Sequence, residues 1–157
     1  THSRQVTEMV LEICDHHPEL AMDRQFLYEA AMLHDIGIIR CNAPSISCFG
    51  EEPYIRHGIV GAEILREEGF PEHARVAERH TGTGLTVSEI ERQQLPLPHR
   101  DFSPETLEEQ AICYADKFYS KSHLDEQKTY ERILKNLDWF GHEGVERFCH
   151  WHEIFAI

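Results

Sequence analysis

Hydrophobic residues recur along this chain at the spacing of helices. Near the N-terminus, four of them stand at i, i+3, i+4 and i+7, namely Val6, Met9, Val10 and Ile13. This spacing predicts an amphipathic helix over residues 2–16. No segment alternates between apolar and polar residues over a useful length, and no internal repeat occurs. Further helices are expected over residues 23–36, 57–68, 71–80, 86–94, 103–120 and 126–155, with an interruption near Gly141 and Gly144.

Capping and breaking residues set the expected helix ends. Asp23 is a suitable N-cap for the second helix, and Gly37 is expected to stop that helix. Ser103, followed by a proline, is typical of a helix start and is the expected N-cap of the helix over 103–120. Glycines, prolines and small polar residues without a period predict irregular segments over 39–56 and 81–104. The whole chain is therefore predicted to form one all-α domain.

Charge and composition restrict the kinds of partner. The formal net charge is −13, which disfavours DNA or long RNA because a strongly acidic surface repels their phosphates. A small anionic substrate remains compatible, since bound metal ions dominate the field inside a site. No run approaches the roughly 18 apolar residues that a membrane span needs. The N-terminus also lacks the pattern of a signal peptide, so a cytoplasmic protein is expected.

The cysteines predict neither disulfides nor a zinc site built from thiolates. Their number is odd, and no two of them form a C-x-x-C pair. Reduced and mostly buried thiols are the expected state. The five residues are Cys14, Cys41, Cys48, Cys113 and Cys149.

The chain contains twelve histidines, and one of them, His34, is followed directly by an aspartate at the end of an apolar helix. His34 and Asp35 end an apolar helix directly before Gly37. Burying an imidazole and a carboxylate costs free energy unless a partner satisfies them, and a divalent metal would do so. Nitrogen and carboxylate donors together suit Fe, Mn, Co, Ni or Zn.

Four more residues add weight to this pair. Each stands at a helix end or on a helix expected to face the core, so six ligands from five helices are able to converge. The four are His2, His57, His80 and Asp116. His150, His152 and Glu153 are assigned no role, because residues i and i+2 of a helix point about 200° apart.

The order of these residues resembles the HD-domain superfamily of metal-dependent phosphohydrolases. His34-Asp35-Ile36-Gly37 resembles the subset named for its His-Asp-Ile-Gly signature. The similarity spans about residues 2–120 and includes Leu33 and Ala115-Asp116-Lys117. It implies a compact all-α HD bundle, to which residues 126–157 add a helical extension.

The resemblance also implies roles for the six residues. His2, His34, Asp35 and Asp116 match the four ligands of the basic site. His57 and His80 match the two further histidines of branches that hold two metals. Asp35 would bridge the metals, and a water or hydroxide between them would be the nucleophile, which places His34 and Asp35 at the centre of catalysis. Two metals about 3.5–4 Å apart lower the pKa of such a water and hold both the attacking and leaving oxygens.

The expected activity is hydrolysis of a small phosphorylated substrate, either a nucleotide or a dinucleotide, by a phosphomonoesterase or a phosphodiesterase. Lys117 follows a ligand directly, so it either reaches a phosphate or forms a structural ion pair. Arg56 precedes a ligand and is able to bind phosphate as a fork, although a solvated arginine is the simpler interpretation. The neighbourhood of Asp116 and the two further histidines also resemble the branch that cleaves dinucleoside polyphosphates. The segment Leu95-Pro96-Leu97-Pro98 departs from that branch, so the substrate stays open.

Two other functions stay open at this point. Some HD-fold proteins with the same ligands hold two irons and act as oxygenases, and the ligand set does not separate them from hydrolases. A non-catalytic nucleotide-binding domain is the third interpretation. The aromatic C-terminal residues are expected to pack between helices, with a homodimer surface as the lesser alternative. These residues are Trp139, Phe140, Phe148, Trp151 and Phe155.

Overall fold

The computed structural model describes residues 1–157 and contains eight α-helices and one sheet of two strands. The helices are α1 (His2–His16), α2 (Arg24–Leu33), α3 (His57–Glu67), α4 (Pro71–Glu78), α5 (Val87–Gln93), α6 (Leu107–Asp116), α7 (Tyr130–Asp138) and α8 (His142–Phe155). Short 3-10 turns are η1 (Pro18–Leu20), η2 (Ile36–Arg40), η3 (Pro44–Ile46) and η4 (Tyr54–Arg56). The predicted all-α class is confirmed. None of the helices has the length and apolar character that crossing a membrane requires.

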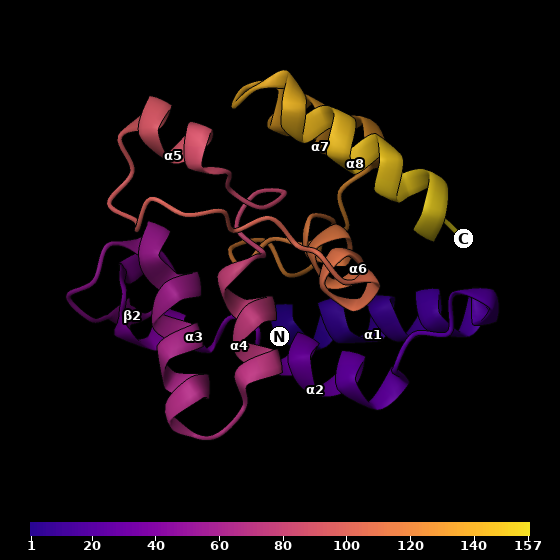
Figure 1. The fold of residues 1–157 in the computed structure, drawn as a ribbon, viewed down its shortest axis with the longest axis horizontal. Helices are drawn as coiled ribbons and strands as arrows, with labels where there is room; N and C mark the ends of the chain where they lie inside the picture. The colour runs from indigo at the N-terminus through magenta and orange to yellow at the C-terminus, as the bar shows by residue number, and fades with distance from the viewer.

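The helices form neighbouring pairs around α6. In Figure 1, α1 and α2 lie alongside each other at the lower right, and α3 and α4 form a second pair at the lower left. α7 and α8 lie together at the top, and α6 contacts α1, α4 and α8. In this view the N-terminus is seen near the centre of the picture and the C-terminus at its right.

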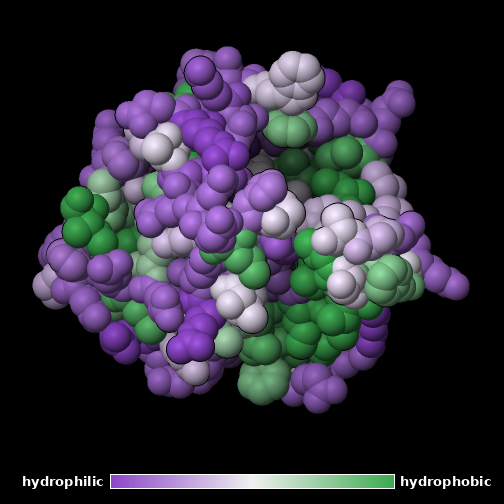
Figure 2. Space-filling view, turned by 180° about the vertical axis from the view of Figure 1, so that it is seen from behind, coloured by the Kyte–Doolittle hydropathy of each residue, from purple (hydrophilic) through white to green (hydrophobic).

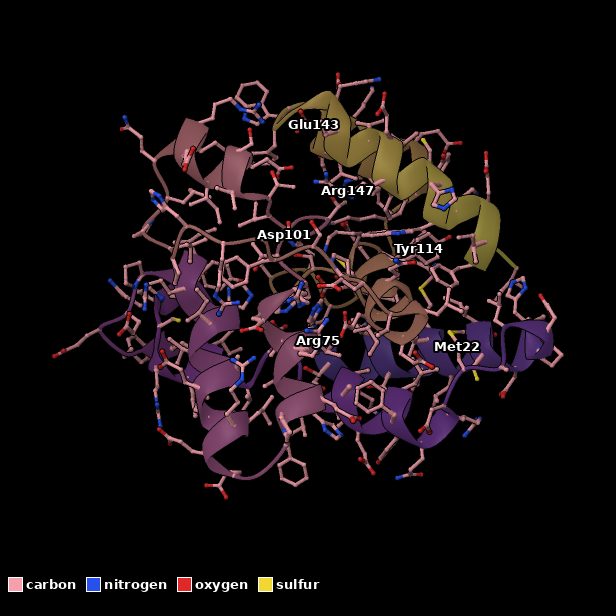
Figure 3. All side chains as sticks on the ribbon, in the orientation of Figure 1. Met22, Arg75, Asp101, Tyr114, Glu143 and Arg147 are labelled. Carbon is pink, nitrogen blue, oxygen red and sulfur yellow. The ribbon has the colours of Figure 1, made fainter.

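One large hydrophobic core joins the first helices to the last ones. Val6 and Val10 of α1, Ile112 of α6 and Phe148 of α8 all belong to it and are fully buried. Tyr114 of α6 lies on the side of this helix toward α8 (Figure 3), where its ring packs 5.0 Å from that of Phe148. Because of these contacts, the C-terminal helices share a core with the region that carries the candidate ligands.

The aromatic residues near the C-terminus divide into two groups. Phe148, Trp151 and Phe155 pack inside the core, as the sequence predicted. Trp139 and Phe140 are 86% and 68% exposed, so the prediction of helix packing is wrong for these two residues. Figure 2 shows the back of the molecule, where hydrophilic residues cover most of the left and middle and hydrophobic residues gather toward the lower right.

A polar contact also ties α8 to the segment after α4. Arg147 reaches from α8 toward that segment (Figure 3). Its guanidinium donates to the hydroxyl of Thr83 at 3.0 Å and to the carboxylate of Glu89 at 2.8 Å. Glu89 is buried, and a buried charge needs a partner, which Arg147 supplies.

The start of α6 differs from the prediction. Its N-cap is Thr106, whose hydroxyl accepts from the backbone N–H of Glu109 at 3.1 Å. The Glu109 carboxylate accepts in return from the N–H of Thr106 at 3.2 Å, which completes a capping box. A box satisfies two free donors where Ser103 would satisfy one, so the helix begins three residues later than expected. It also ends earlier, at Asp116.

Gly37 serves a different purpose from the predicted one. α2 already ends at Leu33, and Gly37 lies inside η2 without a positive φ angle. A Cβ atom at this position would overlap the carbonyl oxygen of His57 and the amide nitrogen of Gly61. Glycine is therefore required because two backbone segments touch, and not because it stops a helix.

The irregular segments contain short regular pieces that no sequence pattern predicts. β1 (Asn42–Ala43) pairs in antiparallel fashion with β2 (Cys48–Phe49). Strands of two residues are too short to show an alternating pattern. The predicted interruption of the last helical region occurs at Gly141, whereas Gly144 lies within α8.

Candidate metal centre

The six candidate ligands converge in the middle of the molecule. His2 is the first residue of α1, His34 and Asp35 follow α2, and His57 is the first residue of α3. His80 follows α4 by two residues, and Asp116 is the last residue of α6. Relative exposures of the five other than Asp116 lie between 0% and 7%, and the Asp116 side chain is 12% exposed. Helix ends thus deliver every one of these side chains to one buried place.

The donor atoms form two sets that share Asp35. One set contains His2, His34, Asp35 and Asp116, and the other contains Asp35, His57 and His80. Within each set the atoms lie within 4.8 Å of one another. This spacing is compatible with one metal ion in each set.

The two carboxylate oxygens of Asp35 face different sets. Oδ1 lies 3.1 Å from Nε2 of His80 and 3.5 Å from Nε2 of His57. Oδ2 lies 3.3 Å from Nε2 of His34 and 3.4 Å from Nε2 of His2. A carboxylate placed in this way is able to bridge two cations.

Local hydrogen bonds orient three of the histidines. In each, Nδ1 contacts the carbonyl oxygen three residues earlier: His34 with Ala31 at 2.6 Å, His57 with Tyr54 at 2.8 Å, and His80 with Ala77 at 2.7 Å. A carbonyl oxygen only accepts, so Nδ1 must carry the proton. In a neutral ring the Nε2 lone pair is then free to point into the centre, which is the arrangement that a metal ligand needs.

Several buried polar atoms of this centre lack a suitable hydrogen-bond partner within the protein. Nε2 of His57 lies 3.0 Å from Nε2 of His80, so two lone pairs face each other when both rings are neutral. Oδ2 of Asp35 and Nδ1 of His2 are buried without a hydrogen bond of acceptable geometry. Buried polar atoms in this state are costly. The residues therefore fit bound cations, which would satisfy the lone pairs and the carboxylate together.

The pKa values of these groups depend on burial and on the neighbouring charges. Burial and the neighbouring His80 lower the pKa of His57 to about 3, and burial also lowers the pKa of His80. Burial opposes the charged form of His34 too, but the Asp35 and Asp116 carboxylates outweigh it and raise the pKa to about 10. Burial raises the pKa of Asp35, but the charge of His34 and the close contacts with His34 and His80 hold it well below its usual range. The carboxylate of Asp35 is thus ionised, with neutral His57 and His80 beside it.

The two predicted substrate contacts are engaged within the protein. The Lys117 ammonium donates to Oδ2 of Asp116 at 2.7 Å and to the carbonyl oxygen of His80 at 2.9 Å. The Arg56 guanidinium donates to Glu52 at 3.0 Å and to the carbonyl oxygen of Pro96 at 2.8 Å. For Lys117 the structure matches the ion-pair interpretation, and contact of either residue with substrate stays a prediction.

Sequence reasoning missed Lys121. Its ammonium lies 3.2 Å from Oδ2 of Asp35 and donates to the hydroxyl of Tyr54 at 2.8 Å. Tyr54 in turn stacks on His57, with ring centroids 4.7 Å apart. Lys121 stands in an irregular segment after α6, where no helical period indicates a direction. A pocket of about 360 Å³ opens beside these residues and reaches His2 and Asp116.

Comparison with known proteins identifies a family for this chain. The profile of the family described as "HD domain" matches residues 1–121. An uncharacterised protein of Methanocaldococcus jannaschii is 39% identical over 160 residues, which cover 92% of this chain and 84% of that protein. No solved structure matches.

Two further relatives are longer proteins. They are the tRNA (cytidine(56)-2'-O)-methyltransferases of Picrophilus torridus, 34% identical, and Thermoplasma volcanium, 27% identical. The matches cover 97% and 99% of this chain but only 40% and 41% of those proteins. This chain therefore corresponds to less than half the length of each methyltransferase.

Proposed function

Because this chain belongs to the HD domain family, we propose that it is a metal-dependent phosphohydrolase that acts on a small phosphorylated substrate, such as a nucleotide or dinucleotide. The observation that carries the proposal is the position of Asp35. One of its oxygens faces His57 and His80, and the other faces His2 and His34. A carboxylate that joins two sets of histidines supports a two-metal centre of the kind that hydrolyses phosphoesters.

The proposed ligands divide between two ions. His2, His34 and Asp116 would hold one ion with Oδ2 of Asp35, and His57 and His80 would hold the other with Oδ1. When bound, two such ions lower the pKa of a water between them and stabilise charge on the attacking and leaving oxygens. The backbone carbonyls behind His34, His57 and His80 keep each ring oriented.

Lys117 would position one of these ligands. Its ammonium binds Oδ2 of Asp116, which leaves Oδ1 facing His2 at 2.7 Å and His34 at 3.2 Å. The same ammonium reaches the carbonyl oxygen of His80. Lys117 thus connects Asp116 of one ligand set with the backbone of His80, which belongs to the other set.

The donor set favours Fe, Mn, Co, Ni or Zn, because it combines imidazole nitrogens with carboxylate oxygens. The nearby thiol of Cys113 is not expected to add a ligand. Burial raises its pKa to about 11, and its Sγ donates to the carbonyl oxygens of His80 and Gly82. A protonated thiol is a poor metal ligand.

Methyl transfer is not what we propose for this chain. This chain spans only 40% of the Picrophilus torridus methyltransferase, and the HD domain profile matches residues 1–121 of this chain. Those relatives nevertheless make nucleotides an apt class of test substrate. A net charge of −13 supports small phosphorylated molecules over long RNA.

The test combines metal analysis with two activity assays. Elemental mass spectrometry of the purified protein should find about two transition-metal ions per chain. The loaded protein should then hydrolyse p-nitrophenyl phosphate or bis-p-nitrophenyl phosphate, and Asp35→Ala should abolish this activity. Absence of metal after reconstitution with each of the five candidate metals would overturn the proposal. Oxygen consumption by the iron form without phosphate release would favour an oxygenase, and bound metal without any turnover would favour a binding domain.

A further inference from the structure

Lysines are rare in this chain, and most of them gather in one place. The sequence contains four, namely Lys117, Lys121, Lys128 and Lys135. Three of the four line the pocket of about 360 Å³ beside the candidate metal centre, which we call the lysine pocket. Such a concentration stands out in a protein with a net charge of −13. The pocket also falls within the range of about 300–1,000 Å³ that is typical of sites for small molecules.

The charge of Lys128 has no partner within the protein. Its ammonium forms no ion pair and no side-chain hydrogen bond, although its backbone N–H bonds to the carbonyl oxygen of Phe118 at 2.7 Å. Burial, together with the charges of Lys117 and Arg132, lowers the pKa of Lys128. An anion in the pocket would relieve this repulsion. Lys117 differs, because Asp116 already balances its charge.

Lys121 connects the pocket to the centre. Its ammonium forms an ion pair with Asp35, with Nζ 3.2 Å from Oδ2, and its side chain is 18% exposed. Cations held by Asp35 would repel this ammonium. A lysine stem rotates freely, so the charge is able to turn toward the pocket.

Hydroxyl groups also contribute to the lining of the pocket. Ser120 and Ser122 lie with their hydroxyl oxygens 3.1 Å apart, and Ser45 faces the same space. Hydroxyls and ammonium groups both donate hydrogen bonds to phosphate oxygens. Lysine is a point charge that binds phosphate in many orientations, whereas arginine imposes a planar fork. The lining therefore suits a flexible phosphorylated chain.

We propose that the lysine pocket binds a phosphate group of the substrate other than the one that is cleaved, so that the substrate carries at least two phosphates. This inference rests on the proposed hydrolase function. Asp116 and His2 border the pocket, so a substrate whose scissile phosphate lies at the metal centre extends directly into it. Lys128 then balances the charge of the second phosphate, and Lys121 lies between the two.

Calorimetric titration with inorganic phosphate and with pyrophosphate tests this assignment, on the protein as purified and after removal of metal. Pyrophosphate should bind more tightly than phosphate. On the metal-loaded protein, Lys128→Gln should weaken pyrophosphate binding about tenfold, the typical loss of one charge-assisted hydrogen bond, and should change little the binding of a single phosphate at the metal centre. Lys128→Arg should restore most of the loss. Lys135→Gln is the matched control, because it removes the same charge from the exposed face of α7.

The outcomes separate this inference from the proposed function. Equal effects of Lys128→Gln and Lys135→Gln, or equal affinities for the two anions, would overturn the second-phosphate subsite. Metal binding and phosphoesterase activity would then still support the hydrolase. A protein that prefers pyrophosphate through Lys128 but never binds metal would instead support the pocket and overturn the hydrolase.

Discussion

Gly37 lies against the backbone of His57 so closely that no side chain fits between them. This contact joins the turn that carries Asp35 to the helix that begins with His57. The distance between these two proposed ligands is therefore fixed by packing of one backbone on another, and not by side-chain length. Protein interiors yield little to such overlaps.

Replacing Gly37 with alanine should damage both stability and the centre. We expect Gly37→Ala to lower the free energy of unfolding by about 1–3 kcal/mol, the usual cost of overpacking. The forced separation should also lower the metal content of the purified protein. Urea unfolding and elemental analysis measure the two effects. Unchanged values for both would show that η2 and α3 separate without cost.

Substitution of the central pair should remove metal and activity together. We expect His34→Ala and Asp35→Ala to lose metal and phosphatase activity while far-ultraviolet circular dichroism stays helical. His142→Ala is the matched control, because His142 is exposed on α8 and lies outside both ligand sets. Full activity in a folded Asp35→Ala protein would refute the assignment of the site.

The second ligand set should respond differently. We expect His57→Ala and His80→Ala each to lower the metal content from about two ions per chain toward one, because His2, His34 and Asp116 stay in place. Elemental mass spectrometry on protein of known concentration measures the ratio. If both variants keep two ions, the two-metal arrangement is wrong.

Glu78 offers a test of stability against pH. Its buried carboxylate binds Arg66 at 2.8 and 3.0 Å and Arg100 at 3.2 Å. Burial raises the pKa of Glu78, but the two guanidinium groups outweigh it and lower the pKa overall. A lowered pKa adds stability above the unfolded value of about 4.3, and that stability is lost as pH falls below it.

Glu78→Gln should therefore be destabilising mainly near neutral pH. We expect a loss of about 1.5–3 kcal/mol at pH 7, since bonds between charged groups are broken. The difference from the original protein should shrink as the pH falls through the acid range. Urea unfolding of the metal-free proteins at several pH values measures this. A difference that stays constant with pH would contradict the role of the Glu78 charge.

The helical framework and the convergence of ligands could be predicted because both depend on local patterns. The apolar period around Val6 and Val10 placed α1 correctly, and helix ends placed His57 and His80 near the middle. The start of α6 was predictable in principle, since Thr106 and Glu109 form a capping-box pattern in the sequence. Ser103, with its following proline, offered a competing start signal.

Other features depend on contacts that no local pattern encodes. Lys121 reaches Asp35 from an irregular segment whose path is set by packing. The overlap of Gly37 with His57 joins two backbone segments that are distant in sequence. Trp139 follows the end of α7 and is exposed, whereas Ile133 within α7 is buried in the core. Such relationships exist only after the chain has folded.

The contact between His2 and Asp116 has a further consequence. These residues are 114 positions apart, yet Nε2 of His2 lies 2.7 Å from Oδ1 of Asp116. An ion shared by both would close the chain into a large loop, as a covalent link does, and loop closure restricts the unfolded state. Helix ends such as the first turn of α1 otherwise fray. Removal of the ion by a chelator should then make the first turn of α1 the first site of proteolysis. The centre would in this way act as a reversible cross-link between α1 and α6.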